Sequence, residues 1–426
     1  MMSSNLKDSL LDELVSDTTG LVRLCSSLVK IPSDNPPGDT SKLASFIRGY
    51  LESHGAAVQA YEPKEGVVSL VSFIGEGRPH LILNGHLDQF PGEVGEEWAR
   101  SPYSGEVIGG ELHGRGSGDM KGGLASLLHC FGKLSAASLP GKVTFTGTSD
   151  EETGGRWGAR WLLDNVEGLH GDAVLNGEPS GLTVRIGEKG RVPLVLRARG
   201  QAAHGSFAGY VGENAIMKMV RALPRVEALQ GTPAPLDAEE LRLTEEVMKG
   251  YKEQYGHESS TMADVLKHVT VNVGVIRGGA KDNIVPALCE AEVDVRLPLG
   301  FSPEEIRRRV EKEVHSVDQG MEVEWGRHTS TLTGSTYTPP DARIVRLLQA
   351  NHAETTGKEP FLSFTSGGHR LPFLEASGRP GGLVRPKGLR DGRRGRAHHS
   401  GGPRDHCKGA HGDDHRLPHR QRVKFL

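Results

Sequence analysis

The segment GKVTFTGTSDEETGG, residues 141–155, is an apolar run of strand length that ends in three adjacent carboxyl groups at positions 150–152. Adjacent carboxylates at the end of a buried strand repel one another unless a cation or a proton compensates their charge. The run DAVLNGEPS, residues 172–180, has a similar arrangement, since a strand-like stretch is followed by a glycine and then by Glu178. Acidic side chains therefore collect where predicted core strands end, and this repetition indicates a site rather than a solvated loop.

The sequence around these segments alternates predicted strands with predicted helices. Further apolar runs of strand length are VVSLVSFIG (67–75) and HLILNGH (80–86). The stretch GGLASLLHCFGKLSAA (122–137) has the apolar spacing of a helix, as do residues 7–30 and 41–55. Strands that alternate with helices predict an α/β domain with a mainly parallel sheet.

A different order of elements follows this first domain, residues 1–188. Between 189 and 330 the predicted elements have the order βαββαβ, which is typical of a ferredoxin-like domain. A polar helical insert at 231–268 interrupts that order, and the segment 331–368 then reads as a return to the first domain. We therefore predict a small domain that is inserted into a larger one.

The bulk composition is that of a globular protein. The chain has 426 residues, of which 36% are hydrophobic and 25% charged, so two folded domains are expected rather than disorder. Its four cysteines are scattered without a CxxC pair, which predicts a reduced intracellular protein without a zinc–thiolate site. Apolar stretches are too short to span a bilayer, and acidic residues interrupt those near the N-terminus. We therefore expect a cytoplasmic protein with no membrane partner.

Two further segments carry candidate site residues. The stretch LILNGHLDQFP (81–91) places His86 and Asp88 at the carboxyl end of a strand, where side chains at i and i+2 share one face. The stretch GRGSGDMKGGLAS (114–126) places Asp119 in a glycine-dense turn before a helix, without the pattern of a nucleotide-binding loop. Either Asp119 caps that helix, or the glycines clear space around an ion that it holds.

These segments together predict a metal centre. They supply His86, Asp119, Glu152 and Glu178, with Asp88 and Glu151 beside them. In an α/β sheet the carboxyl ends of the strands share one crevice. Mixed imidazole and carboxylate ligands suit Zn²⁺, with Co²⁺ or Mn²⁺ as alternatives. An aspartate that bridges two ions and a spare glutamate that acts as general base are the groups needed to activate a metal-bridging water.

The ordered motifs H-x-D, G-x-x-D-M-K-G, D-E-E and G-E-P also carry a resemblance. Over residues 15–368 the chain resembles the metallo-aminoacylase and peptidase family of acetylornithine deacetylase, succinyl-diaminopimelate desuccinylase, aminoacylase and glutamate carboxypeptidase. The resemblance implies a zinc-peptidase-like catalytic domain with an inserted dimerisation or lid domain, and cleavage of the amide bond of an N-acyl amino acid. The alternatives are a dipeptidase or carboxypeptidase of the same family, and a catalytically dead dimeric binding protein.

The resemblance implies a role for each ligand. His86 and Glu178 would bind one zinc ion, and Glu152 would bind the other. Asp119 would bridge the two ions.

The neighbouring residues receive roles in the same way. Asp88 would orient the imidazole, and Glu151 would be the general base. The peptide bond at 119–120 would be cis.

In the inserted domain the resemblance rests on RGQAAHGS (199–206) and GGAKDNIVPALCEAEVDVR (278–296). His204 would reach the active site of the partner in a homodimer and stabilise the oxyanion. Asn283 and Arg296 would line the substrate pocket.

The C-terminal segment, residues 369–426, departs from the family pattern. It has 14 Lys and Arg residues against five Asp and Glu residues, a net charge of +9 in a chain whose overall net charge is −3. Family members end the site with a segment like SGGTD…YGP…DEHI, whose final His is the last ligand, whereas FTSGG (364–368) is followed here by HRLPFLEASGRPGG. A frame shifted by one base from His369 can encode the family pattern. We therefore predict an extra nucleotide or a misplaced splice site, with Ala397 at the position of the last ligand, weak metal binding and impaired activity.

A basic tail that binds nucleic acid is the alternative interpretation of this segment. Its basic residues are not interleaved with aromatic residues that could stack on bases, which argues against that interpretation. We therefore expect a small N-acyl amino acid or a short peptide as substrate, and no nucleic-acid partner.

Overall fold

The apolar segments of the first part of the chain pair into one five-stranded sheet. In the computed structural model its order is β1 (Val58–Lys64), β2 (Val67–Gly75), β6 (Lys142–Thr148), β3 (His80–His86) and β7 (Ala173–Asn176). Only β2 runs against the direction of the other four strands, so the mainly parallel sheet is confirmed. The residues that the structure describes are 4–92, 98, 100–256, 259–326, 332–365 and 422–424.

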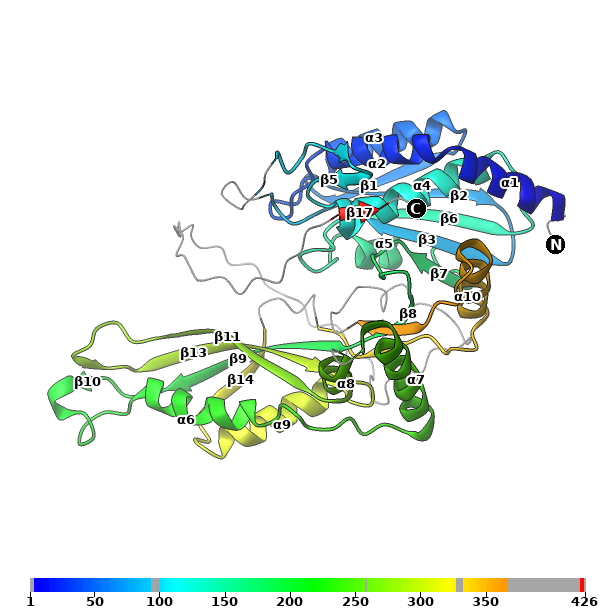
Figure 1. Cartoon of the computed structure of the whole chain (residues 1–426). Coiled ribbons are helices and arrows are strands. Elements are labelled where there is room, and N and C mark those ends of the chain that lie inside the picture. Colours follow the sequence, from blue (N-terminus) through cyan, green and yellow to red (C-terminus); the bar gives the residue numbers. More distant parts are fainter. Residues whose placement is uncertain are drawn as a thin grey trace.

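One face of this sheet is covered by three helices: α2 (Thr18–Val29), α3 (Ser41–Ser53) and α4 (Gly122–Ser135) (Figure 1). Their buried side chains form one core cluster that includes Leu70 of β2. The next residue, Val71, belongs to a separate cluster because successive side chains of a strand point to opposite faces. The sheet is therefore buried on both sides.

The opposite face of the sheet is covered by α5 (Ala159–Asn165), whose Leu162 shares the second cluster with Val71. The N-terminal helical region is divided into α1 (Ser4–Ser16) and α2, where the sequence pattern predicts one helical stretch. The division has a local cause, since the Asp17 carboxylate accepts a hydrogen bond from Gly20 N and caps the second helix.

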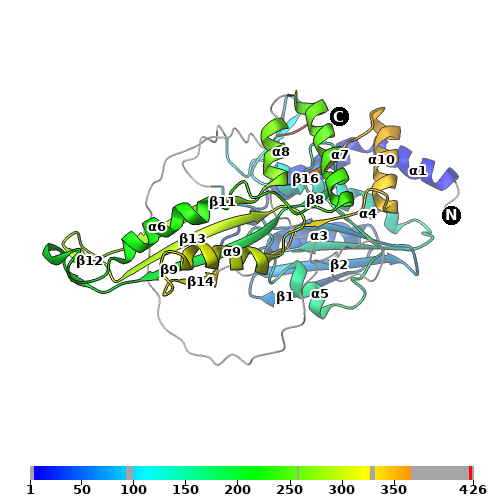
Figure 2. The same cartoon turned by 90° about the horizontal axis from the view of Figure 1, so that it is seen from below.

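A second sheet, in the order β11-β13-β9-β14, is antiparallel throughout. Its elements in chain order are β9 (Gly190–Arg199), α6 (Ala215–Glu227), β11 (Thr270–Gly278), β13 (Leu288–Leu297), α9 (Pro303–His315) and β14 (Glu322–Trp325). This is the order βαββαβ that the sequence predicts. Both helices pack on one face of the sheet, as the view from below shows (Figure 2). Buried apolar side chains fill the space between them and the strands.

A small third sheet lies between the two larger ones (Figure 1). It has the order β15-β8-β16 and is accompanied by three helices. These elements are β8 (Val184–Glu188), α7 (Ala238–Tyr255), α8 (Ser259–Lys267), β15 (Thr336–Tyr337), α10 (Arg343–Thr356) and β16 (Leu362–Thr365). Leu243 and Val247 of α7 share a buried cluster with Ile186 and Phe364. The helical insert therefore contributes its apolar side chains to the junction between the two sheets.

Short strands complete the described structure. β10 (Ala203–His204) pairs with β12 (Ile284–Val285), and β4 (Glu106–Ile108) and β5 (Glu111–His113) pair with each other. The strand β17 (Arg422–Lys424) pairs with β5. The rest of the segment 369–426 lies outside the described residues, and so do the predictions made on it, including Ala397. Among the helices that the structure describes, none combines the length and apolar character of a membrane span.

Candidate metal centre

The candidate ligands come from the ends of neighbouring elements. His86 is the last residue of β3, Glu152 follows β6, and Glu178 follows β7, whereas Asp119 lies in the turn η1 (Ser117–Lys121) immediately before α4. Since β6, β3 and β7 are parallel neighbours, their carboxyl ends meet at one edge of the sheet. Side chains that lie up to about ninety positions apart in the sequence are brought together in this way.

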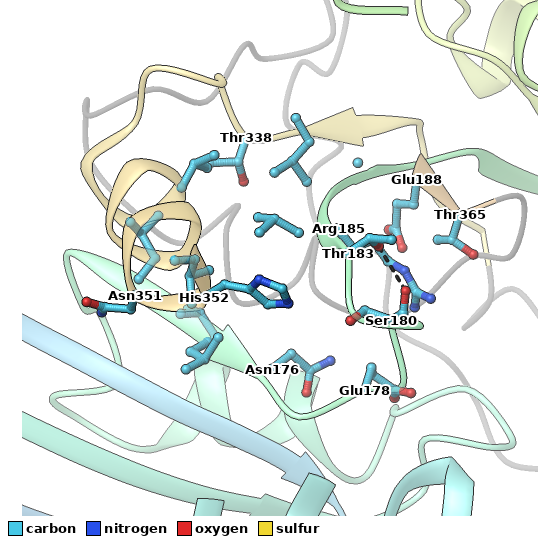
Figure 3. Close-up of a pocket in the computed structure, with 18 of the residues that line it drawn as sticks. Asn176, Glu178, Ser180, Thr183, Arg185, Glu188, Thr338, Asn351, His352 and Thr365 are labelled. Carbon is cyan, nitrogen blue, oxygen red and sulfur yellow. Dashed lines mark hydrogen bonds between the residues drawn. The ribbon is translucent and has the colours of Figure 1, made fainter. Parts of the chain in front are cut away.

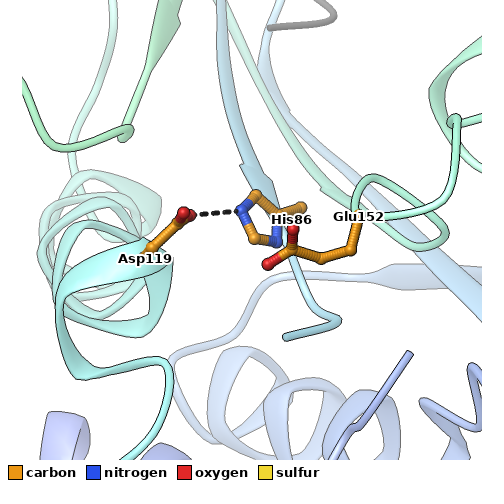
Figure 4. A group of neighbouring side chains, drawn as sticks. All are labelled: His86, Asp119 and Glu152. Carbon is orange, nitrogen blue, oxygen red and sulfur yellow. Dashed lines mark hydrogen bonds and ion pairs between the residues drawn. The ribbon is translucent and has the colours of Figure 1, made fainter. Parts of the chain in front are cut away.

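The side chains converge on the imidazole of His86. Its Nε2 atom is 3.0 Å from Asp119 Oδ1 and 3.4 Å from Glu178 Oε1. Ligand atoms of His86, Asp119 and Glu152 all lie within 4.8 Å of one another (Figure 4). Ligand atoms bind a zinc ion at about 2.0–2.2 Å, so atoms that share one ion lie within about 4 Å of one another, and atoms on two neighbouring ions can lie farther apart. The observed spacing is therefore compatible with a metal centre.

The other nitrogen of His86 is held by the main chain. Nδ1 lies 2.8 Å from the carbonyl oxygen of Asp88, while the nearer carboxylate oxygen of Asp88 is 3.7 Å away. A carbonyl oxygen can only accept a hydrogen bond, so Nδ1 carries the proton and Nε2 is left to face the acidic groups. The sequence predicts that Asp88 orients the imidazole. In the structure the short contact comes from its main chain rather than from its side chain.

The carboxylate of Asp88 instead holds the loop after β6. Its Oδ1 accepts a hydrogen bond from Glu151 N and its Oδ2 one from Glu152 N, both at 3.0 Å. Both acidic residues of that loop are thus fixed through their main chain. Glu151 also lines a small cavity together with His86 and Glu178.

The pKa values of His86 and Glu152 are both raised in this cluster. Burial by itself lowers the pKa of His86, but Glu178 and Asp119 raise it well above its usual value. Burial raises the pKa of Glu152 to about 8, with His86 acting against the shift and the neighbouring carboxylates adding to it. Part of the rise in the pKa of Glu152 thus comes from repulsion between ionised carboxylates. A bound cation would remove that repulsion.

Glycine makes the close approach of two ligand segments possible. A Cβ atom at Gly123, near the start of α4, would lie 1.7 Å from the carbonyl oxygen of Gly177, which precedes Glu178. The peptide bond Asp119–Met120 is cis, as the resemblance implies. Met120 Sδ accepts a hydrogen bond from the main-chain N of His86. The glycine-dense turn thus brings Asp119 to the edge of the sheet.

A larger cavity, of about 480 Å³, adjoins the cluster through Glu178 (Figure 3). Strands β7 and β8 and the helix α10 line it, and its wall is mostly apolar. The His352 ring projects into it from α10 (Figure 3). Its other labelled polar side chains are Asn176, Ser180, Thr183, Arg185, Glu188, Thr338, Asn351 and Thr365.

Of the three predicted residues of the inserted domain, two lie at the far tip of the second sheet and the third pairs with a neighbour on its own strand. His204 is exposed at the far tip, where its Nδ1 lies 2.8 Å from Ser206 Oγ (Figure 1). Asn283 lies at the same tip, and its carbonyl oxygen accepts a hydrogen bond from Gly205 N. The Arg296 guanidinium is paired with Asp294, with Nε 3.0 Å from Oδ2. In one copy of the chain His204 and Asn283 therefore lie at the far tip, and Arg296 pairs with a residue of its own strand.

The structure adds residues that the sequence does not single out. Asn35 donates hydrogen bonds from its side chain to Asp88 and Thr153. Lys121 is fully buried, and its Nζ donates to the carbonyl oxygen of Ile31. The sequence offers two features near these residues: two prolines follow Asn35, and Lys121 lies two residues after Asp119. Neither feature indicates which group these side chains contact.

A family model described as Peptidase family M20/M25/M40 matches residues 82–401 of the chain. The match extends past Gly368 into the segment for which the sequence predicts a changed reading frame. Among curated relatives, a succinyl-diaminopimelate desuccinylase of Methylorubrum extorquens is 30% identical over 374 residues, which cover 83% of this chain and 87% of the relative.

Solved structures have a similar fold. The M20 family metallo-carboxypeptidase Sso-CP2 from Sulfolobus solfataricus aligns with a TM-score of 0.68 and 19% identity, over 83% of this chain and 88% of that one. The YXEP protein of Bacillus subtilis, described as a dinuclear metal binding peptidase from the M20 family, aligns with a TM-score of 0.54 and 14% identity, over 84% and 86%. Given a family match over most of its length, the chain belongs to peptidase family M20/M25/M40 and is a metal-dependent amidohydrolase.

Proposed function

We propose that the chain cleaves the amide bond of an N-acyl amino acid, as a deacylase or desuccinylase does. The observation that carries this proposal is the position of His86 Nε2, which faces Asp119 and Glu178 while Nδ1 is held by a carbonyl oxygen. The desuccinylase relative supports the acyl substrate, because its identity spans most of both chains.

We assign the metal ligands as the resemblance implies them. His86 and Glu178 would hold one ion, Glu152 would hold a second, and Asp119 would contribute to both. The donor set of one imidazole and three carboxylates fits Zn²⁺ best, with Co²⁺ and Mn²⁺ as alternatives. When bound, the ions would supply a Lewis acid and lower the pKa of a water molecule.

In this proposal Glu151 is the general base. It lies on the loop whose main chain Asp88 fixes, and it lines the small cavity together with His86 and Glu178. A base held there can accept the proton of an attacking water and later deliver it to the leaving amine.

The second sheet is assigned to substrate closure and dimerisation. His204 and Asn283 lie at its tip beside exposed apolar side chains, among them Tyr210, which is 94% exposed, and Phe207. An exposed apolar tip favours contact with another protein surface, and a second copy would bring these residues toward its partner's metal centre. Arg296 would bind the carboxylate of the substrate. In this proposal the protein is a homodimer in the cytoplasm.

The changed reading frame after Gly368 also remains a prediction. Sequencing the coding DNA and the transcript around positions 367–369 tests it directly. An unbroken frame confirmed by peptides from the segment 369–426 would contradict it.

The function is tested on the chain of 426 residues and on a version with the restored frame. Both are stripped with a chelator, reloaded with Zn²⁺ or Co²⁺, and assayed on N-acetyl amino acids, N-succinyl amino acids and dipeptides. We expect the restored version to hydrolyse an N-acyl substrate only when metal is present, and the chain as written to be weaker. Cleavage confined to dipeptides would favour the peptidase alternative. Bound metal without hydrolysis of any of these would favour a binding protein.

A further inference from the structure

The turn at residues 33–38 lies against the segment that follows β3. Asn35 N donates a hydrogen bond to Gln89 O at 2.8 Å, and Gln89 N donates to Ser33 O at 3.0 Å. Ser33 Oγ donates to the carbonyl oxygen of Leu87 at 2.7 Å. These three bonds fix the turn to the chain immediately beyond His86.

The side chain of Asn35 points from this turn into the buried region between two loops. It is 4% exposed, and its Nδ2 atom donates to Asp88 Oδ2 at 2.8 Å and to Thr153 Oγ1 at 3.0 Å. One amide group therefore uses its two hydrogens on two segments, one that follows β3 and one that follows β6.

The bond to Asp88 is placed where the orientation of its carboxylate matters. Asp88 is 1% exposed, and its two oxygens accept the main-chain N–H groups of Glu151 and Glu152. Rotation of that carboxylate would break one or both of these partly buried hydrogen bonds. A fully buried donor left without an acceptor costs about 1–3 kcal/mol. The hydrogen bond from Asn35 opposes this rotation.

We propose that Asn35 is a positioning residue of the metal centre. Its side-chain amide sets the orientation of the Asp88 carboxylate, and the carboxylate in turn sets the main-chain positions of Glu151 and Glu152. This inference rests on the proposed function, in which Glu151 is the base and Glu152 is a ligand.

The position requires a carboxamide. An aspartate of the same shape has no donor at neutral pH and would place a second carboxylate 2.8 Å from Asp88 Oδ2. Serine or threonine offers a single donor, so it could not serve Asp88 and Thr153 together. Replacement of Asn35 should therefore loosen the loop that follows β6 and leave the strands of the sheet intact.

Hydrogen exchange of the full chain, without metal, tests this inference. In Asn35→Ala we expect the Glu151 and Glu152 amides to exchange at least tenfold faster than in the parent chain, and in Asn35→Asp faster still. The matched control is Thr153→Val, which removes the second bond of Asn35 and the bond from Thr153 Oγ1 to Asp150 but keeps the bond from Asn35 to Asp88, and it should change the exchange less than threefold. Peptides from β3 and β6 should exchange at the parent rate in every variant.

Unchanged exchange of the Glu151 and Glu152 amides in Asn35→Ala would overturn the inference. Equal acceleration in all peptides would also overturn it, because that result indicates general destabilisation. Co²⁺ binding by the same variants, made in the version with the restored frame, separates this inference from the proposed function. If the parent chain and Asn35→Asp bind Co²⁺ equally well, the positioning role fails. If no protein binds Co²⁺ while the exchange changes as expected, the metal centre fails and the positioning role stands.

Discussion

One nitrogen of the His86 imidazole, Nδ1, is hydrogen bonded to the main chain. The carbonyl oxygen of Asp88 accepts from Nδ1, so the tautomer is set two residues along the same segment. The acidic groups that face Nε2 come from other elements, Asp119 from the turn before α4 and Glu178 from the loop after β7. A local contact thus prepares the ligand, and distant contacts complete the site.

The proposed base can be tested by one substitution. In the version with the restored frame, Glu151→Gln should lower kcat by about 10²–10⁴-fold, because the amide cannot accept the proton of water. Metal content, measured by atomic emission, should stay unchanged, since Glu151 is not assigned as a ligand. The control is Glu167→Gln in an exposed turn. A parent-like kcat in Glu151→Gln would remove the residue from the mechanism.

Lys189 gives the stability of the chain a defined pH dependence. It is 2% exposed, and its Nζ donates to the carbonyl oxygens of Val265 and His268. Burial lowers the pKa of Lys189 to about 7, from 10.5 in a solvated lysine. Between these two values the unfolded chain holds more protons than the folded one, so the lysine makes the free energy of unfolding rise with pH in that range.

Urea unfolding of the parent and Lys189→Met at pH 7 and pH 9.5 checks this. The free energy of unfolding of the parent, taken relative to that of the variant, should be about 3 kcal/mol larger at pH 9.5 than at pH 7, by the relation of about 1.4 kcal/mol per pH unit between the two pKa values. Other titrating groups are common to both proteins and cancel in the comparison. A difference that does not change with pH would show that Lys189 stays protonated when folded.

At the scale of elements, the candidate site depends on how closely α4 approaches the loop after β7. The glycine at 123 has no side chain, and the carbonyl oxygen of Gly177 occupies the place that a Cβ atom would take. Both Asp119 and Glu178 lie within a few residues of this contact. The spacing of two candidate ligands therefore depends on a contact between two glycines.

Gly123→Ala should accordingly destabilise the chain by about 1–3 kcal/mol, because the added methyl group must displace main-chain atoms. It should also weaken Co²⁺ binding. Gly49→Ala is the matched control, since Gly49 lies in α3 with no atom within 4 Å of an added Cβ. That substitution should stabilise the chain by up to about 1 kcal/mol through helix propensity. Thermal unfolding of both variants tests the contrast, and equal effects would contradict it.

At the scale of the whole molecule, two large sheets are joined through a small third one. The helical insert packs Leu243 and Val247 on that third sheet, so the connection between the lobes has a buried apolar core of its own. The tip of the second sheet has the opposite character, because Phe207 and Tyr210 are exposed there. One end of the second sheet is thus joined to the third sheet, and its other end exposes apolar side chains to solvent.

If that tip is a dimer contact, its apolar side chains should be needed for association. We expect the parent chain to sediment as a dimer and the double variant Phe207→Ser, Tyr210→Ser as a monomer. Val15→Ser, which replaces an exposed apolar residue of α1, is the control and should leave the dimer intact. A parent that sediments as a monomer at micromolar concentration would contradict the assignment of the tip.

The sequence by itself determined the order of the elements and the chemistry of the candidate ligands. Strand and helix periodicities are local, so the βαββαβ order and the α/β sheet could be predicted from them. His86, Asp119, Glu152 and Glu178 could be named because imidazole and carboxylates follow predicted strands or glycine-rich turns. Local patterns could not show that His204 and Asn283 lie at the far tip of the second sheet in a single chain.

The tertiary structure alone decided which groups hold the candidate ligands in place. The carbonyl oxygen of Asp88, the amide of Asn35 and the contact of Gly123 with Gly177 join segments that are well separated in sequence, or use main-chain atoms that every residue possesses. No residue type marks such an atom in advance, because hydrogen bonds of this kind form only after packing has fixed the distance between segments. The sequence therefore specified what could bind a metal, and packing specified where each ligand stands.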